Sequence, residues 1–139
     1  MKLFLRVILT ILPFLYMGAI WIMSSMPDNV VLNLPDDSTD RFIKEGLHLV
    51  EFAILYILFV IALAANGALT PRLSLVAALA AGFYGIADEI HQSFVPYRSA
   101  TLIDAAKDWT GVLAVYFHVR YHYFSRNRGF LTHIRKYFQ

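Results

Sequence analysis

One run of ionisable and amide side chains interrupts an otherwise apolar part of the chain: Asp88-Glu89-Ile90-His91-Gln92. Further charges follow at Arg98, Asp104, Lys107 and Asp108. A histidine beside carboxylates is the usual material of general acid–base chemistry, and an arginine fork binds phosphate or carboxylate groups. Ionisable groups placed against segments apolar enough to enter a bilayer are costly, so a functional site is the first hypothesis.

Helical spacing aligns these groups with a second set upstream. Side chains three, four or seven residues apart lie on one face of a helix. Three sets have this spacing: Lys44, His48 and Glu51; Asp88, His91 and Gln92; Asp104, Lys107 and Asp108. A lipid-facing stripe of this polarity costs roughly 3 kcal/mol per charge, so we expect the three faces to share an interior pocket. Glu89 lies about 100° from Asp88 around its helix, and we expect it to face a neighbouring helix.

The elements that must position these groups are membrane spans. Hydrophobic residues make up 58% of the 139-residue chain and charged residues only 16%, which is too apolar for an ordinary soluble domain. Spans need about 20 residues each. Separated by turn residues, four candidates fill the chain: Leu3–Met23, Phe42–Ala65, Arg72–His91 and Leu102–Tyr121. The chain has no cysteine, which excludes disulfides and thiolate metal sites.

The first of these segments has a competing interpretation. Lys2 and Arg6 precede an apolar stretch, as in a signal peptide. The stretch is long for a signal peptide, no clear small-residue cleavage site follows it, and Trp21 is typical of an interfacial anchor. We therefore expect a membrane span.

The orientation follows from the distribution of charge. With four spans, the side that holds both termini carries eight basic residues and the other side carries four. The positive-inside rule then places both termini in the cytoplasm. All ten acidic residues fall on the outer half: Asp28, Asp36, Asp37, Asp40, Glu45, Glu51, Asp88, Glu89, Asp104 and Asp108.

These observations predict an all-α polytopic membrane protein with four transmembrane helices and both termini cytoplasmic. Residues 1–121 form the membrane domain. Residues 122–139 form a basic amphipathic cytoplasmic tail, a short interfacial segment whose arginines and aromatic residues suit an anionic leaflet. The predicted partners are membrane lipids, and nucleic acid is not expected. The oligomeric state stays open.

Three interpretations of the outer polar cluster remain open. It is a structural ion-pair network, a binding pocket for a headgroup, sugar or peptide at the outer leaflet, or a catalytic site. For catalysis, the candidates are His91 or His48 as base and Glu89 or Glu51 as its partner. His48-x-x-Glu51 and Glu89-x-His91 also offer metal-binding groups, but the spacing matches no established zinc signature, and we predict neither a metal nor a cofactor.

The sequence resembles the VanZ-like family of small bacterial membrane proteins over about residues 15 to 120. The resemblance rests on Asp88-Glu89-Ile90-His91-Gln92-Ser93-Phe94-Val95-Pro96-Tyr97-Arg98 with Asp104, Asp108 and Gly111. Upstream, Lys44 with His48-Leu49-Val50-Glu51-Phe52, and Trp21 with Ser24-Ser25, are similar to further elements of that family. Two departures are Tyr97, where a glycine is expected, and Ala114 or Val115, where a small residue is expected after Gly111.

The resemblance implies a multi-pass protein of the bacterial cytoplasmic (inner) membrane. The family's named member is associated with reduced susceptibility to the glycopeptide teicoplanin, and most members have no assigned activity. We therefore expect a cell-envelope protein whose outward-facing pocket binds an outer-leaflet lipid headgroup or a cell-wall intermediate. An intramembrane hydrolase or transferase acting on a lipid-linked substrate is the alternative, so the enzymatic question stays open. The expected ligand-binding residues are Lys44, His48, Glu51, Asp88, Glu89, His91, Gln92, Arg98, Asp104 and Asp108.

Overall fold

The computed structural model describes residues 1–26, 37–96, 98 and 101–139, without the side chains of residues 37–45 and 48. This part of the chain is all-helical and contains no strand, which confirms the predicted all-α class. Thr70 and Thr101 cap α4 and α5 by accepting the backbone N–H three residues on. The helices are α1 (Lys2–Ser24), α3 (Asp37–Ala65), α4 (Pro71–Gln92), α5 (Leu102–Val119), the π-helix η1 (Arg120–Ser125) and α6 (Phe130–Phe138).

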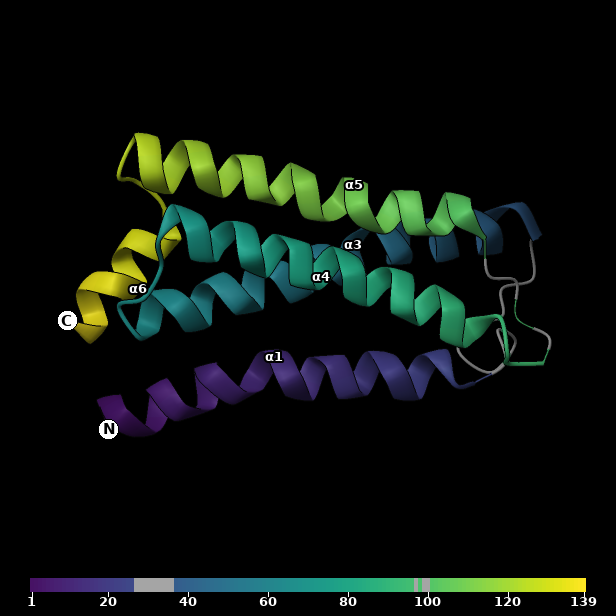
Figure 1. Ribbon diagram of the computed structural model, residues 1–139, viewed down its shortest axis with the longest axis horizontal. Coiled ribbons are helices and arrows are strands. Elements are labelled where there is room, and N and C mark those ends of the chain that lie inside the picture. The colour runs from purple at the N-terminus through teal and green to yellow at the C-terminus, as the bar shows by residue number, and fades with distance from the viewer. Residues whose placement is uncertain (27–36, 97, 99–100) are drawn as a thin grey trace.

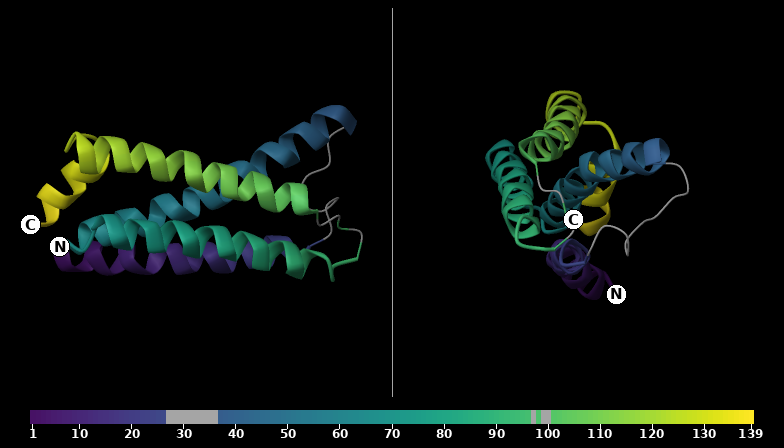
Figure 2. Two further views of the ribbon diagram at one scale, coloured as in Figure 1. Left: turned by 45° about the horizontal axis from the view of Figure 1, so that its top comes forward. Right: turned by 90° about the vertical axis from the view of Figure 1, so that its right-hand side faces the viewer.

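The four long helices form an elongated bundle with both chain termini at the same end (Figure 1). The helix α3 is central, because it packs against α1, α4, α5 and α6, and most extensively against α5 (Figure 2). We call the end formed by the C-terminal ends of α1 and α4 and the N-terminal end of α5 the acidic end. The opposite end, formed by the start of α1 with η1 and α6, is the basic end.

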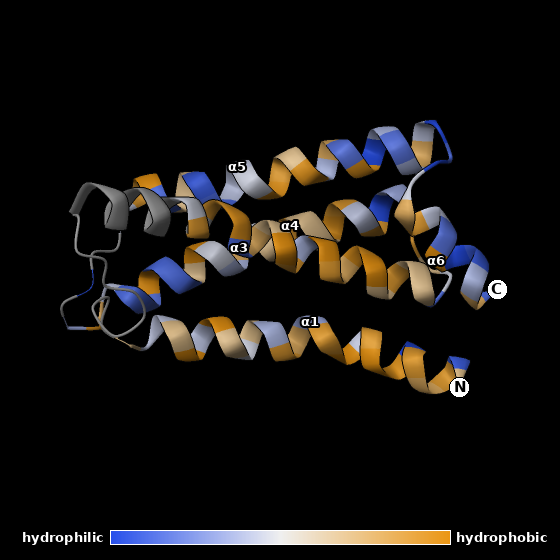
Figure 3. Cartoon of the chain, turned by 180° about the vertical axis from the view of Figure 1, so that it is seen from behind, coloured by the Kyte–Doolittle hydropathy of each residue, from blue (hydrophilic) through white to orange (hydrophobic). Residues whose placement is uncertain are grey.

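Two of the described helices, α1 and α4, are long and apolar enough to cross a membrane. Only 11% of the apolar window of α1 is buried, against 44% of that of α4, so α1 presents most of its apolar surface outward (Figure 3). Leu3, Phe4, Phe14 and Leu15 are among its exposed side chains. The apolar part of α3, Leu49–Ala65, is shorter. The four-span topology stays a prediction.

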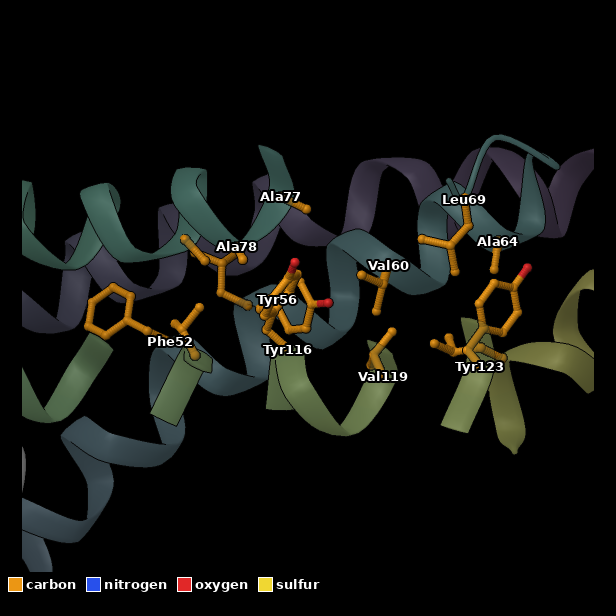
Figure 4. Packing of buried hydrophobic residues seen from close by; sticks show 14 of the residues in the cluster. Phe52, Tyr56, Val60, Ala64, Leu69, Ala77, Ala78, Tyr116, Val119 and Tyr123 are labelled. Atoms are coloured by element: carbon orange, nitrogen blue, oxygen red, sulfur yellow. The ribbon is translucent and has the colours of Figure 1, made fainter. Parts of the chain in front are cut away.

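The core lies along α3 and includes the small residues Ala77 and Ala78 of α4 (Figure 4). Phe52 and Tyr56 of α3 are fully buried, as is Val112 of α5. The Tyr56 hydroxyl has a polar partner, Ser74 Oγ of α4, at 2.8 Å. A buried hydroxyl without such a partner is destabilising, so this hydrogen bond offsets the cost of burying the two hydroxyl groups.

Glycines allow α5 to approach its neighbours closely. A Cβ added at Gly111 would lie 1.9 Å from the Leu49 carbonyl oxygen of α3. A Cβ added at Gly82 of α4 would lie 2.6 Å from the indole of Trp109. Small residues at these two positions therefore let α5 pack closely against α3 and α4.

The C-terminal segment folds back onto the bundle. The π-helix η1 follows α5, after which Asn127 and Gly129 adopt positive φ angles of 48° and 101° and reverse the chain. The helix α6 then packs against α3 and buries Leu131 and Phe138. The predicted interfacial tail is therefore in part a helix that covers the basic end of the bundle.

Candidate functional site

The acidic end brings together polar residues from α1, α3, α4 and α5. Asp88 and Asp108 have exposed fractions of 0%, and Glu89 is also buried. Charged residues are almost never fully buried unless they are paired. Such burial at neighbouring positions marks this end of the bundle as the candidate site.

Asp88 is held by an amide on its own helix. Gln92 Nε2 donates to Asp88 Oδ2 at 2.5 Å and to Ser24 Oγ of α1 at 3.3 Å. All three side chains are buried. The second carboxylate oxygen, Oδ1, is buried without a hydrogen-bond partner in the described part of the chain. One acceptor of Asp88 is thus left for a donor that these residues do not supply.

Asp108 owes its position to a glycine. A Cβ added at Gly85 of α4 would lie 3.1 Å from Asp108 Cβ and Oδ2. Any side chain at position 85 would therefore press on the carboxylate. The i, i+3 spacing of Gly82 and Gly85 creates a smooth strip on α4 that accepts Trp109 and Asp108 of α5.

Electrostatic interactions join the carboxylates of three helices. The half-buried Glu51 of α3 interacts with the charges of Asp88 and Arg98. Asp108 interacts with Glu51, Asp88, Glu89 and Asp104. Carboxylates from α3, α4 and α5 therefore lie within electrostatic reach of one another, with the guanidinium of Arg98 beside them. The predicted convergence of the three helices is therefore present for the side chains that the structure describes.

Glu89 links α4 to the start of α5, and it does face a neighbouring helix as expected. Its Oε2 accepts a hydrogen bond from the backbone N–H of Thr101 at 3.1 Å. Thr101 Oγ1 in turn donates to Asp104 Oδ2 at 2.6 Å, and Lys107 Nζ lies 2.9 Å from Asp104 Oδ1. Asp104 and Lys107, which their spacing placed on one helix face, thus form an ion pair.

Arg98 contacts the end of α1. Its Nη1 donates to the carbonyl oxygens of Met23 and Met26, at 3.1 and 3.0 Å. The last carbonyls of a helix have no partner within the helix, and a cation there also interacts favourably with the helix dipole. Arg98 therefore caps α1, a role that the sequence interpretation did not assign to it.

His91 lies flat against Trp21. The two rings are stacked with centroids 3.8 Å apart and an angle of 5° between their planes. His91 Nδ1 is buried without a hydrogen-bond partner among the described residues, and within that part of the chain His91 bonds to no carboxylate. The hypothesis that His91 and Glu89 form an acid–base pair thus gains no support from their contacts.

Two of the expected site residues lie outside the described side chains. The backbone of α3 is described at Lys44 and His48, and their side chains lie outside the described part of the structure. Among the described residues, no group of three or more His, Asp and Glu side chains is arranged to hold a metal ion.

Sequence reasoning missed the contribution of α1 to this site. Ser24 receives a hydrogen bond from Gln92, Trp21 stacks on His91, and the Met17 carbonyl accepts from the Tyr84 hydroxyl at 2.8 Å. The spacing of Trp21 and Ser24, three residues apart at the end of an apolar helix, was the available signal.

Comparison with protein-family models, with curated proteins and with solved structures gives no match to this chain.

Proposed function

We propose that this chain is a VanZ-like cell-envelope protein that crosses the bacterial cytoplasmic membrane four times, with both termini inside. Its acidic cluster, formed by Glu51, Asp88, Glu89, Asp104 and Asp108, binds the cationic group of an outer-leaflet lipid headgroup or of a cell-wall intermediate. The observation that carries the proposal is the fully buried Asp88, whose Oδ1 has no partner among the described residues.

The buried Oδ1 of Asp88, which has no partner among the described residues, supports a cationic ligand group. An ammonium group offers both the charge and the hydrogen-bond donors that Asp88 Oδ1 requires. An anionic group has less support as the first contact, because Nη1 of Arg98 is engaged with the carbonyls at the end of α1.

Catalysis by His91 has less support than binding, because its imidazole is stacked on Trp21 and not directed at a carboxylate of the described chain. A purely structural network predicts that each buried carboxylate is required for folding. The binding proposal predicts that some carboxylates are required for ligand and not for folding.

The binding test compares Asp88→Asn with Tyr84→Phe. The first keeps an acceptor for Gln92 but removes the charge, and the second removes a hydrogen bond to α1 without changing any charge. Binding of phosphatidylethanolamine to the delipidated protein in detergent is measured by native mass spectrometry, with phosphatidylglycerol for comparison. We expect Asp88→Asn to weaken phosphatidylethanolamine binding about tenfold, the effect of roughly 1.4 kcal/mol, and Tyr84→Phe to leave it unchanged.

A cellular measurement complements it: teicoplanin susceptibility of cells that express each variant at equal membrane levels. Loss of folded Asp88→Asn protein would favour the structural network. Equal binding by Asp88→Asn and the unmodified chain would refute the proposed site. If Glu89→Gln abolished the phenotype while phosphatidylethanolamine binding survived, the hydrolase or transferase alternative would replace binding.

The topology has its own test, because the chain contains no cysteine and every introduced thiol is unique. Ser25 follows α1 at the acidic end and Ser125 ends η1 at the basic end, and both are exposed. We expect a membrane-impermeant maleimide to label Ser25→Cys in intact cells and Ser125→Cys only after lysis. Labelling of Ser125→Cys in intact cells would reverse the proposed orientation.

A further inference from the structure

A half-open cavity of about 190 Å³ lies at the basic end, between α3, α5, η1 and α6. Most of its lining is apolar, with Val60 and Ile61 from α3, Val115 and Val119 from α5 and Leu131 from α6. His118, His122 and Arg128 add polar groups to the same lining. The three polar side chains are exposed, so they lie where the cavity meets its surroundings.

The backbone builds this cavity with unusual local geometry. The π-helix η1 carries His122, and π-helical segments occur frequently at functional sites. The turn after it places the Arg128 N–H on the His122 carbonyl oxygen at 2.9 Å. Asn127 and Gly129, both with positive φ, then lead α6 back across the opening. The reversal therefore sets Arg128 and His122 side by side at the cavity.

Charge at this end is of one sign. The sequence from Trp109 to Gln139 contains no acidic residue. Three arginines there donate to tyrosine hydroxyls of the chain itself: Arg120 to Tyr116, Arg126 to Tyr121 and Arg135 to Tyr123. Arg128 is different, because its side chain forms no hydrogen bond or ion pair with the described residues, and it is the arginine that lines the cavity.

We propose that this cavity binds one anionic phospholipid from the leaflet on the side of the termini. Part of an acyl chain occupies the apolar wall, and Arg128 and His122 hold the phosphate. An apolar cavity of roughly 150 Å³ is large enough to take up a small hydrocarbon. A zwitterionic headgroup fits less well, because its ammonium would face basic residues. Juxtamembrane basic residues gain about 1 kcal/mol each from an anionic leaflet.

The test measures lipid binding by the purified, delipidated full chain in detergent. The probes are phosphatidylglycerol, phosphatidylcholine, inorganic phosphate and a free fatty acid, and the readouts are native mass spectrometry and the shift in unfolding temperature. We expect phosphatidylglycerol to bind most tightly. Arg128→Gln should weaken it about fivefold, the equivalent of ~1 kcal/mol. The matched control Arg126→Gln, which removes an equal charge outside the cavity, should change binding less than twofold.

A second variant tests the apolar wall. Val115→Phe fills part of the cavity and should weaken the binding of phosphatidylglycerol at least as much as Arg128→Gln does. If Arg128→Gln and Arg126→Gln weakened phosphatidylglycerol binding equally, the proposal would be wrong. The lipid would then be attracted by the summed positive charge and not by a specific site. If inorganic phosphate raised the unfolding temperature as much as phosphatidylglycerol does, the cavity would bind anions in general and the lipid proposal would be wrong. Because Arg128 is exposed, the Arg128→Gln result decides even if Val115→Phe does not fold. The cavity is at the opposite end from the acidic cluster, so either proposal can fail alone.

Discussion

The acidic and basic ends of the bundle differ in how far their charged side chains are buried. At the acidic end, Asp88 and Asp108 are completely buried and depend on specific neighbours, Gln92 and Gly85. At the basic end, Arg120, Arg126 and Arg128 are exposed, and the interior holds a largely apolar cavity. Removing the partner of one buried charge is strongly destabilising, whereas a single exposed charge contributes little to stability. The acidic end should therefore respond to single substitutions far more strongly.

The closest helix contacts lie near the buried carboxylates. Added Cβ atoms at Gly82, Gly85 and Gly111 would meet a neighbouring helix. At the other glycines a Cβ meets nothing within 4 Å, apart from an atom 4.0 Å away at Gly129. Tight helix contacts and buried carboxylates thus occur together, because close approach of the helices leaves the carboxylates little access to water.

The largest effect is expected for Gly111→Ala. The added methyl group would collide with the Leu49 carbonyl and force α3 and α5 apart, at a cost of about 3 kcal/mol or more in free energy of unfolding. Denaturant unfolding in detergent measures it. Gly18→Ala is the control, because a Cβ there meets nothing within 4 Å and alanine favours the helix by about 1 kcal/mol. Equal stability of the two variants would contradict the close approach.

A smaller effect is expected for Arg98→Ala. Loss of the two hydrogen bonds from Nη1 to the end of α1 should lower the free energy of unfolding by about 2 kcal/mol and speed amide hydrogen exchange in residues 22–26. Arg126→Ala, at the basic end, removes a guanidinium that bonds to one exposed tyrosine and should cost less than about 0.5 kcal/mol. If both substitutions lowered the free energy of unfolding by the same amount, the two ends would not differ as described.

The smallest effect, of opposite sign, is expected for Asp88→Asn. The amide keeps an acceptor for Gln92 but removes a negative charge that repels the carboxylate of Asp108. Unfolding at neutral pH should therefore show a gain of about 1 kcal/mol, alongside the weakened ligand binding predicted above. A loss of stability would mean that a positive charge already neutralises Asp88 in the folded protein.

Much of the fold could be predicted from the sequence, because the length of apolar runs and the turn residues determine helix number. The span predicted at Arg72–His91 is α4, Pro71–Gln92, and the span predicted to start at Leu102 is α5. The α3 helix begins at Asp37, five residues before the predicted Phe42, since charged residues can extend a helix beyond its apolar part. The return of α6 onto α3 was not predicted, because it depends on backbone conformation at Asn127 and Gly129.

The candidate site could be predicted only in part. Spacing along one helix predicted that Asp88 and Gln92 share a face, and the contact between them is present. The partners of Arg98 are backbone carbonyls, which every residue possesses and which leave no signal in the sequence. The stacking of His91 on Trp21 depends on which helices are neighbours, and periodicity within one helix does not contain that information.

The peripheral helix α1 forms hydrogen bonds at both ends with residues that are synthesised later. Arg98 holds its last turn, and near its start Arg6 Nη2 donates to the Phe138 carbonyl at 2.6 Å. Until Arg98 and Phe138 have been synthesised, α1 lacks both of these contacts. The final position of α1 therefore depends on residues that lie between 72 and 132 positions further along the chain than the residues they contact.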